Sequence, residues 1–208
     1  MTVKWMLIPT LGALLFTSPI LASGSQKQGS GKHKVETHTY KLDPSHSRLG
    51  FKVPHLGITS VSGYFKNFEG SLTFEGGKPV AAEATLNVSS VFTDNEKRDD
   101  HLKADDFFGE KSHPVIKFKS KKVIVKGKDI TVMGDLTIRD ITKTITLKGT
   151  FGGTVYIEAW KVHKAGLSLK GSINRQDFGL KFSKFLGTGE AMVGDKVELV
   201  IDLEANRS

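Results

Sequence analysis

The sequence contains no cysteine among its 208 residues. Disulfide bonds and thiolate metal sites are therefore excluded, and so is the lipidated cysteine that anchors bacterial lipoproteins. Proline is scarce, with 6 residues, whereas glycine is abundant, with 22. This balance suits a chain that makes many tight turns between short elements. The length is sufficient for one sizeable hydrophobic core.

The sequence also lacks the motifs of common enzyme classes. It has no HExxH zinc motif and no nucleophile elbow, and His46, His55, His101 and His113 are widely spaced. The carboxylates at residues 99–106 are expected to face water on a short helix. We therefore predict a protein that is not an enzyme and that uses no metal and no cofactor. A hydrolase or isomerase acting on a lipid is the alternative.

No apolar run is long enough for a membrane-spanning helix, which needs about 20 apolar residues. The almost unbroken run Trp5–Phe16 is preceded by a positive charge and followed by small residues, which is the order of a cleavable signal peptide. We predict a signal peptide at residues 1–22 and a periplasmic protein, with an uncleaved anchor as the alternative. Residues 23–36 are rich in Gly, Ser, Lys and Gln, which predicts a flexible linker. The folded domain is predicted over residues 37–206.

The formal net charge is +8 at pH 7. Lysines such as Lys117 and Lys119 alternate with apolar residues, which favours a solvated basic exterior over a nucleic-acid groove. We therefore predict no nucleic-acid partner. A transient contact with an anionic membrane surface is compatible with this charge. The sequence also leaves open whether two copies form a homodimer.

Most of the chain alternates apolar and polar residues with a period of two, which predicts strands with one buried face. Turn residues separate these segments, and no long amphipathic helix is present to cover a parallel sheet. The pattern predicts an all-β sandwich or barrel, and a barrel of about eight strands holds either packed side chains or one small ligand. Small residues on the apolar face would leave room for a ligand or would accommodate facing aromatic rings. These small residues are Gly63, Ala82, Ala84 and Gly134.

The stretch 93–120 departs from this alternation. Thr93 and Glu96 have the spacing of a capping box, which predicts a short helix. His113-Pro114 cannot continue a helix, so the chain is expected to leave it extended. One short helix in a β-rich chain predicts a cap over a β-container. Further along the chain, Gly152-Gly153 predicts a turn between two strands.

Taken in order, these segments resemble the YceI-like family, lipocalin-like barrels that bind polyisoprenoids and related lipids. The resemblance covers almost the whole folded region. One departure is Asp140, because the family pattern usually has glycine after the arginine. The matching segments are DPSHS at 43–47, FKVPHLG at 51–57, VSGYF at 61–65, GSLTF at 70–74, a helical insert with Thr93, Asn95, Arg98-Asp99, His101-Leu102 and DFF at 106–108, then Pro114, Ile116, Phe118 and Ser120, GDLTI at 134–138, Thr142-Lys143, and INRQDFGL at 173–180.

The resemblance implies an extended antiparallel eight-stranded barrel with one short helical insert. It further implies non-catalytic binding or carriage of a long-chain isoprenoid lipid, such as a polyisoprenoid or an isoprenoid quinone, in an apolar pore. A partner-binding module at a membrane redox complex is the alternative. The candidate pore-lining residues are Phe51, Val53, Phe65, Phe74, Leu86, Phe118, Leu136, Ile138 and Phe178, each of which could equally be ordinary core.

Arg98, His101 and Arg175 are candidate contacts for a lipid head group at the pore mouth, because charged donors favour polar head groups. The alternative is a structural network, of the Arg98–Asp99 type, that fastens the helix to the barrel rim.

Overall fold

The protein is described by a computed structural model, which covers residues 35–187, 189 and 191–208. The predicted signal peptide and all but the last two residues of the predicted linker lie outside the described residues. Among the residues that are described, no helix is both long and apolar enough to cross a membrane.

Residues Val35–Ser208 form one unit of strands with one short α-helix. Its elements, in chain order, are β1 (Thr37–Leu42), β2 (Arg48–His55), β3 (Thr59–Phe65), β4 (Phe68–Glu75), β5 (Lys78–Asn87), the 3₁₀-helix η1 (Val88–Ser90), β6 (Val91–Phe92), α1 (Glu96–Lys103), β7 (Val115–Lys126), β8 (Asp129–Ile138), β9 (Ile141–Ile157), η2 (Glu158–Trp160), β10 (Val162–Asn174), η3 (Arg175–Phe178) and β11 (Lys196–Arg207).

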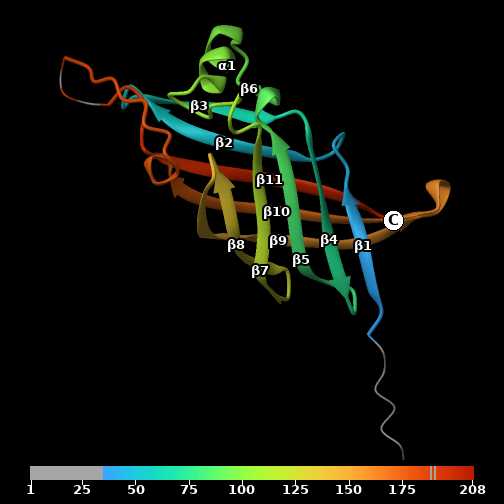
Figure 1. The fold of residues 1–208 in the computed structure, drawn as a ribbon. Helices are drawn as coiled ribbons and strands as arrows, with labels where there is room; N and C mark the ends of the chain where they lie inside the picture. The colour runs from blue at the N-terminus through green and yellow to red at the C-terminus, as the bar shows by residue number, and fades with distance from the viewer. Residues whose placement is uncertain (1–34, 188, 190) are drawn as a thin grey trace, which may run out of the picture. The chain divides into compact units, whose positions relative to one another are not determined.

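Eight of the strands close into a ring. The order of hydrogen-bonded neighbours is β1-β4-β5-β7-β8-β9-β10-β11, and β11 pairs with β1 to complete the circle. Every pairing in the ring is antiparallel. Figure 1 shows the strands β4, β5, β7 and β8 in front of β9, β10 and β11. The prediction of an all-β, eight-stranded antiparallel barrel is therefore confirmed, and closure leaves the ring without a free sheet edge.

One strand of the ring has two partners on the same side. The end of β11, Ala205–Arg207, pairs with β1, whereas its middle, Glu198–Asp202, pairs with β2. The chain passes from one partner to the other through the corner at Asp43–Ser47. β2 then continues into β3 and β6, which extend the wall at the end where α1 packs (Figure 1).

Alternation along the strands places the apolar side chains inside the barrel. They form two buried clusters, one around Leu72 and Phe74 and the other around Val88 and Phe178. Side chains that contact both clusters are only partly buried, although they come from the apolar faces of barrel strands. Partial exposure in such positions indicates space inside the barrel. These side chains are Phe68, Ala84, Phe118, Ile145, Leu199, Ile201 and Leu203.

The helix begins two residues later than the capping-box spacing suggests. Asn95, not Thr93, caps α1, because the Asn95 side chain accepts a hydrogen bond from the backbone N–H of Arg98 at 3.0 Å. The hydroxyl oxygen of Thr93 instead accepts a hydrogen bond from Nε of Arg98 at 2.7 Å, and the hydroxyl donates to the carboxylate of Asp99 at 2.5 Å. A buried side-chain bond thus outcompeted the local cap that the sequence spacing predicted.

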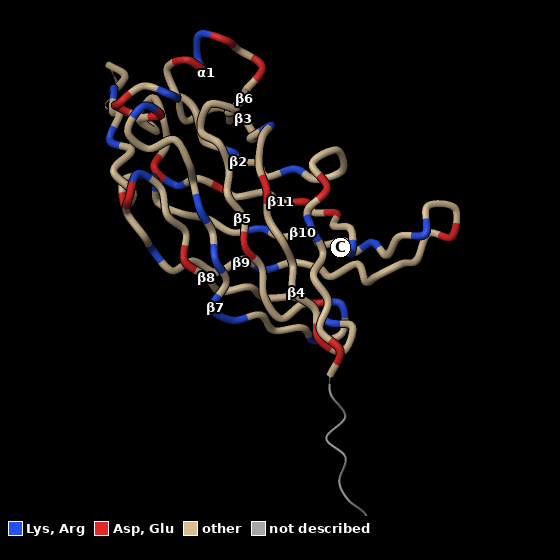
Figure 2. The backbone as a smooth tube through the Cα atoms, turned by 45° about the vertical axis from the view of Figure 1, so that its right-hand side comes forward, with Lys and Arg blue, Asp and Glu red and all other residues tan. Residues whose placement is uncertain are grey.

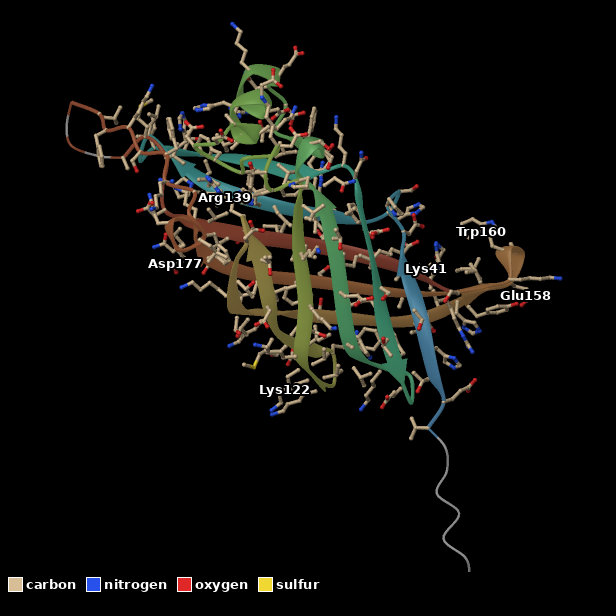
Figure 3. All side chains as sticks on the ribbon, in the orientation of Figure 1. Lys41, Lys122, Arg139, Glu158, Trp160 and Asp177 are labelled. Carbon is tan, nitrogen blue, oxygen red and sulfur yellow. The ribbon has the colours of Figure 1, made fainter. Side chains whose placement is uncertain are left out.

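The turn predicted at Gly152-Gly153 is wrong. β9 runs through both glycines without turning, and the chain reverses only at η2, near the tip where Figure 3 labels Glu158 and Trp160. Gly153 adopts φ of 97°, and the register with β10 shifts at this point, so that the glycine pair forms a bulge. A bulge and a turn both need a residue that accepts positive φ, and the sequence alone does not separate them.

Charged residues are distributed over most of the barrel surface. Figure 2 shows basic and acidic residues interspersed along strands and loops rather than gathered in one band. Some cations lie over aromatic rings, as Arg48 does over Tyr64 at 4.0 Å and Lys66 over Phe92 at 3.5 Å. This distribution agrees with a solvated basic exterior.

Candidate ligand-binding cavity

The barrel encloses a cavity of about 370 Å³. Inward-facing residues of the barrel strands form most of its wall, and almost all of them are aliphatic or aromatic. The few lining residues with an ionisable side chain are His55, Glu83, Arg98, His101 and Arg175. Such a wall can hold an apolar chain, because it offers contact area and very few hydrogen-bonding groups.

Seven of the nine candidate pore residues line this cavity. They are Phe51, Val53, Phe65, Leu86, Phe118, Leu136 and Ile138.

The other two candidates, Phe74 and Phe178, do not line the cavity, and each is only 1% exposed. Phe74 packs beside the rings of Tyr40 and Phe151, with centroids 4.5 and 5.9 Å away. Phe178 belongs to η3, so the inside–outside alternation of a strand does not apply to it.

The four small residues of the apolar face fall into two groups. Ala82 and Ala84 line the cavity. Gly63 and Gly134 instead accommodate aromatic rings: a β-carbon on either would lie 2.5 Å from Cζ of a phenylalanine, Phe51 at Gly63 and Phe118 at Gly134. Small side chains therefore leave open space at two positions and fit facing rings at two others.

All three candidate head-group residues line the cavity, but Arg98 is engaged within the protein. Its Nε donates to the Thr93 hydroxyl at 2.7 Å, and one Nη donates to the Thr93 carbonyl. The buried carboxylate of Asp99 accepts the backbone N–H of Thr93 at 2.9 Å and also its hydroxyl. These bonds are those expected of a network that fastens α1 to the segment that follows β6.

His101 is more accessible than Arg98. Its Nε2 lies 2.8 Å from Oδ2 of Asp106, and its side chain is 45% exposed. The imidazole packs edge-on against Phe107 and Phe182, with centroids 4.9 and 5.0 Å away. Phe107 and Phe182 stack on each other at 4.8 Å. His101 thus combines a polar edge with an aromatic surround at the end of the cavity, and its contact with a head group stays a prediction.

Arg175 is 3% exposed and serves mainly as a structural anchor. Its guanidinium donates to the carbonyls of Gly194, Leu180 and Val193 at 3.0, 2.6 and 3.2 Å. It also lies 2.8 Å from the carboxylate of Asp195. Burial lowers the pKa of Arg175, and the Asp195 carboxylate opposes that shift. These partners pin the segment between η3 and β11 to the barrel and leave the guanidinium little capacity for a ligand.

Sequence reasoning missed the contribution of that segment. Phe182, Met192 and Val193 line the cavity, together with Leu102 and Phe107 from the region of α1. The segment shows no strand alternation, so periodicity could not place it. The available signal was several large apolar residues in a stretch with four glycines, which is unusual for a purely solvated loop.

Among the described residues, Asp43, His46 and Glu204 could present three ligand atoms to a metal. Nζ of Lys164 lies 2.5 Å from Glu204 and 3.5 Å from Asp43, so an ammonium group is already paired with both carboxylates. The hydrogen bond from His46, 2.9 Å away, lowers the pKa of Asp43 from its ordinary 3.8 to about 2, against the opposing effect of burial. The cluster is an ion-pair network at the β1–β2 corner.

A family model of the YceI-like domain matches residues 40–205. The chain belongs to the YceI-like family. A UPF0312 protein of Pseudomonas fluorescens is 35% identical over 96% of this chain and 98% of its own. The protein YceI of Escherichia coli is 33% identical over 79% of this chain and 85% of its own. The recognised resemblance is thereby confirmed.

Solved structures of YceI barrels have the same fold. The YceI protein of Campylobacter jejuni is 33% identical, with a TM-score of 0.65, over 74% of this chain and 90% of its own. BcnA of Burkholderia cenocepacia, 22% identical, has a TM-score of 0.67 over 79% of this chain and 99% of its own. A polyisoprenoid binding domain from Saccharophagus degradans, 15% identical, has a TM-score of 0.60 over 81% and 98%. The last two likenesses establish the fold alone.

Proposed function

We propose that this protein binds and carries a long-chain isoprenoid lipid in its barrel cavity and performs no chemistry on it. The observation that carries the proposal is the apolar cavity at the centre of a closed barrel. A buried methylene is worth about 0.8 kcal/mol, so a long chain gains affinity from such a wall without polar contacts. The likeness to a domain that binds polyisoprenoid supports an isoprenoid as the ligand class.

The lining chemistry supports an apolar chain along most of the cavity, and three of the five ionisable lining residues lie near α1. Arg98, His101 and Arg175 mark that end, and the donors of Arg175 are bonded to the protein. A head group there would meet His101 first, because that side chain is the most accessible of the three. We therefore orient the lipid with its head group towards α1 and its chain towards the Leu72 cluster.

The place of action that we propose is the periplasm, which follows from the signal peptide predicted at residues 1–22. N-terminal sequencing of the exported protein tests this part of the proposal. A mature chain that begins near residue 23 supports it, and a chain that retains Met1 contradicts it.

The direct test of the function is mass spectrometry of the protein purified under native conditions, followed by organic extraction. We expect an isoprenoid chain in the extract at near-stoichiometric amount. An extract without bound lipid would contradict carriage. A second incubation with the recovered lipid distinguishes carrier from enzyme, because a carrier returns the lipid chemically unchanged.

A partner-binding module is the second candidate, and one observation favours it. Val155, Tyr156 and Trp160 are 53%, 45% and 68% exposed on the projecting tip of the β9–β10 hairpin (Figure 3). Exposed apolar residues gathered on one element are typical of a contact site. A pull-down that compares the unchanged protein with Trp160→Ser tests this candidate. A partner that binds the tip should be captured by the unchanged protein and not by the variant.

A further inference from the structure

Two loops meet at one end of the barrel, beside residues that line the cavity. The β2–β3 turn follows His55, and its Leu56 N–H donates to the carbonyl of Met192 at 2.9 Å. Gly194 N–H donates back to the carbonyl of Pro54, also at 2.9 Å. Pro54 and His55, at the end of β2, line the cavity, and so do Met192 and Val193 of the segment before β11. In Figure 1 both loops lie at the left-hand end of β2. The lining residues at the end of β2 and before β11 therefore extend the cavity to this end of the barrel.

Each loop presents one large apolar side chain to solvent. Ile58, in the β2–β3 turn, is 85% exposed, and Phe185, in the segment before β11, is 66% exposed. Phe185 is tied into the same structure by a bridge to Ala191, next to Met192. The two side chains stand on separate loops rather than on one flat face, which suits insertion between lipid head groups better than the continuous contact of a protein interface.

Basic side chains lie at this end and along the outer wall that leads from it. A groove on the outer wall is lined by Pro54 and Ser60, which flank the β2–β3 turn, and also by lysines of β2, β9 and β11. Lys181 and Lys184 add two charges on the loop that carries Phe185. The groove lysines are Lys52, Lys143, Lys148, Lys170 and Lys196.

The acidic groups facing these lysines are fewer. Asp177 and Glu198 line the groove, and Asp195 is paired with Arg175. Asp106, whose carbonyl accepts the N–H of Phe182, is paired with His101. Within the described part of the chain, no ion pair joins the groove lysines, Lys181 or Lys184 to a carboxylate. The end of the barrel that the cavity reaches is therefore positive and complementary to an anionic surface.

We propose that this end docks on an anionic lipid bilayer, with Ile58 and Phe185 entering the head-group region and the lysines facing lipid phosphates. The inference rests on the proposed function, because the bilayer is the source or the destination of the lipid. An isoprenoid chain that leaves the bilayer and crosses water exposes its apolar surface, which is unfavourable in free energy. Docking with the cavity end against the membrane lets the chain move between bilayer and barrel without that exposure.

The test is sedimentation with vesicles, comparing phosphatidylcholine alone with phosphatidylcholine mixed with phosphatidylglycerol. We expect binding to the anionic vesicles only. The double variant Ile58→Ser/Phe185→Ser should weaken that binding about tenfold or more, because both apolar anchors are lost. Lys181→Gln/Lys184→Gln should weaken it by about fivefold for each lysine. All comparisons use the same exported chain, so any contribution from its N-terminal segment cancels.

Matched variants from other parts of the barrel serve as controls. Val155→Ser/Trp160→Ser removes exposed apolar residues from the β9–β10 tip, on the opposite side of Figure 1. Lys126→Gln/Lys128→Gln removes two exposed lysines at the β7–β8 turn. We expect both controls to bind vesicles like the unchanged protein. Equal loss in the control and test pairs, or equal binding to neutral vesicles, would overturn the proposed docking surface.

Failure of this inference is distinguishable from failure of the proposed function. Lipid extracted from the Ile58→Ser/Phe185→Ser protein reports on the cavity, whereas sedimentation reports on docking. Bound lipid without vesicle binding would leave the carrier function intact and overturn the docking surface. Vesicle binding that needs Ile58 and Phe185, in a protein without extractable lipid, would support the docking surface and contradict carriage.

Discussion

The ring of Phe118, on β7, lies against the backbone of Gly134, on β8. A β-carbon at residue 134 would lie 2.5 Å from Cζ of that ring and 2.6 Å from the carbonyl oxygen of Lys119. Both distances are far shorter than van der Waals contact, so neither group can stay in place if residue 134 gains a side chain. Because Phe118 also lines the cavity, this contact links the fold of the wall to the size of the cavity.

Gly134→Ala is therefore expected to destabilise the barrel by about 1–3 kcal/mol, the usual cost of overpacking. It should also push the Phe118 ring into the cavity and lower the amount of bound lipid. Urea denaturation and lipid extraction measure the two effects. Gly166→Ala is the control, since its nearest neighbour would be the Leu203 carbonyl at 3.9 Å. Equal losses in the two variants would show that the contact with Phe118 is not the cause.

Phe118→Trp is expected to narrow the cavity while the barrel stays folded. Phe118 packs against both core clusters and is only partly buried, so a larger ring held over Gly134 must extend into the open space. Lipid content should fall, and the midpoint of urea unfolding should change little. Unchanged lipid uptake in a folded protein would contradict the assignment of Phe118 to the ligand-contacting wall.

Phe178→Leu is the complementary substitution. Phe178 is fully buried and lies away from the cavity wall, so its loss should cost about 1 kcal/mol or more of stability through the space left behind. Lipid content per folded molecule should be unchanged. A drop in lipid content that equals the one in Phe118→Trp would mean that lipid uptake follows stability rather than cavity shape.

The sequence was sufficient to predict the barrel, because alternation fixes which face of each strand points inwards. It was not sufficient to locate the open space inside. Ala84 borders the cavity and Gly134 is covered by a ring, yet both are small residues on the apolar face. Phe178 follows a strand in the sequence but lies in a 3₁₀-helix. Separating these cases requires the three-dimensional position of residues distant in the chain.

The polar residues of the site show the same limit. Arg98 and Arg175 carry charged donors that suit a lipid head group. Their positions in the sequence do not predict which carbonyl groups of the folded protein lie near them. The structure places Thr93 beside Arg98 and three loop carbonyls beside Arg175. Burying a hydrogen-bond donor costs less free energy when the donor has a partner. A buried arginine is therefore expected to bond to groups of the protein unless a ligand takes their place.

Arg175→Met is expected to destabilise the protein by about 3 kcal/mol or more, because it leaves buried carbonyls without donors. The segment that Arg175 holds should become the first site of cleavage in limited proteolysis. Arg48→Met is the control, since Arg48 is exposed and stacks only on Tyr64. If Arg175 contacted a head group and had no structural role, Arg175→Met would lower the lipid content and leave the stability unchanged.

The β8–β9 turn offers a test of the departure at Asp140. Arg139 and Asp140 both have positive φ, 51° and 63°, which is the conformation of a type I′ turn. Asp140→Ala should cost about 1 kcal/mol, because alanine is disfavoured there and the contact with Nδ1 of His113 at 2.9 Å is lost. Asp140→Gly should change the free energy of unfolding much less, since glycine accepts positive φ. Equal destabilisation by both substitutions would mean that the His113 contact, not the backbone, determines the effect.

The corner between β1 and β2 should make the stability of the barrel depend on pH in the acid range. Asp43 has a pKa of about 2 in the folded protein, below its ordinary 3.8, so folding favours its ionised form. The resulting stabilisation is fully present above pH 3.8 and is lost as the pH falls through about 2. Its size is at most about 2 kcal/mol, and less to the extent that water screens the exposed His46.

Asp43→Asn removes the titrating group and tests this directly. In urea unfolding at a series of pH values, the variant should be less stable than the unchanged protein near neutral pH. The difference should shrink as the pH approaches about 2, where Asp43 itself becomes protonated. Lys164 keeps its charge throughout, because its ordinary pKa of 10.5 lies far above this range and the hydrogen bond to Glu204 raises it further. A deficit that is the same at every pH would mean that Asp43 stabilises the corner through its shape and hydrogen bonds and not through its charge.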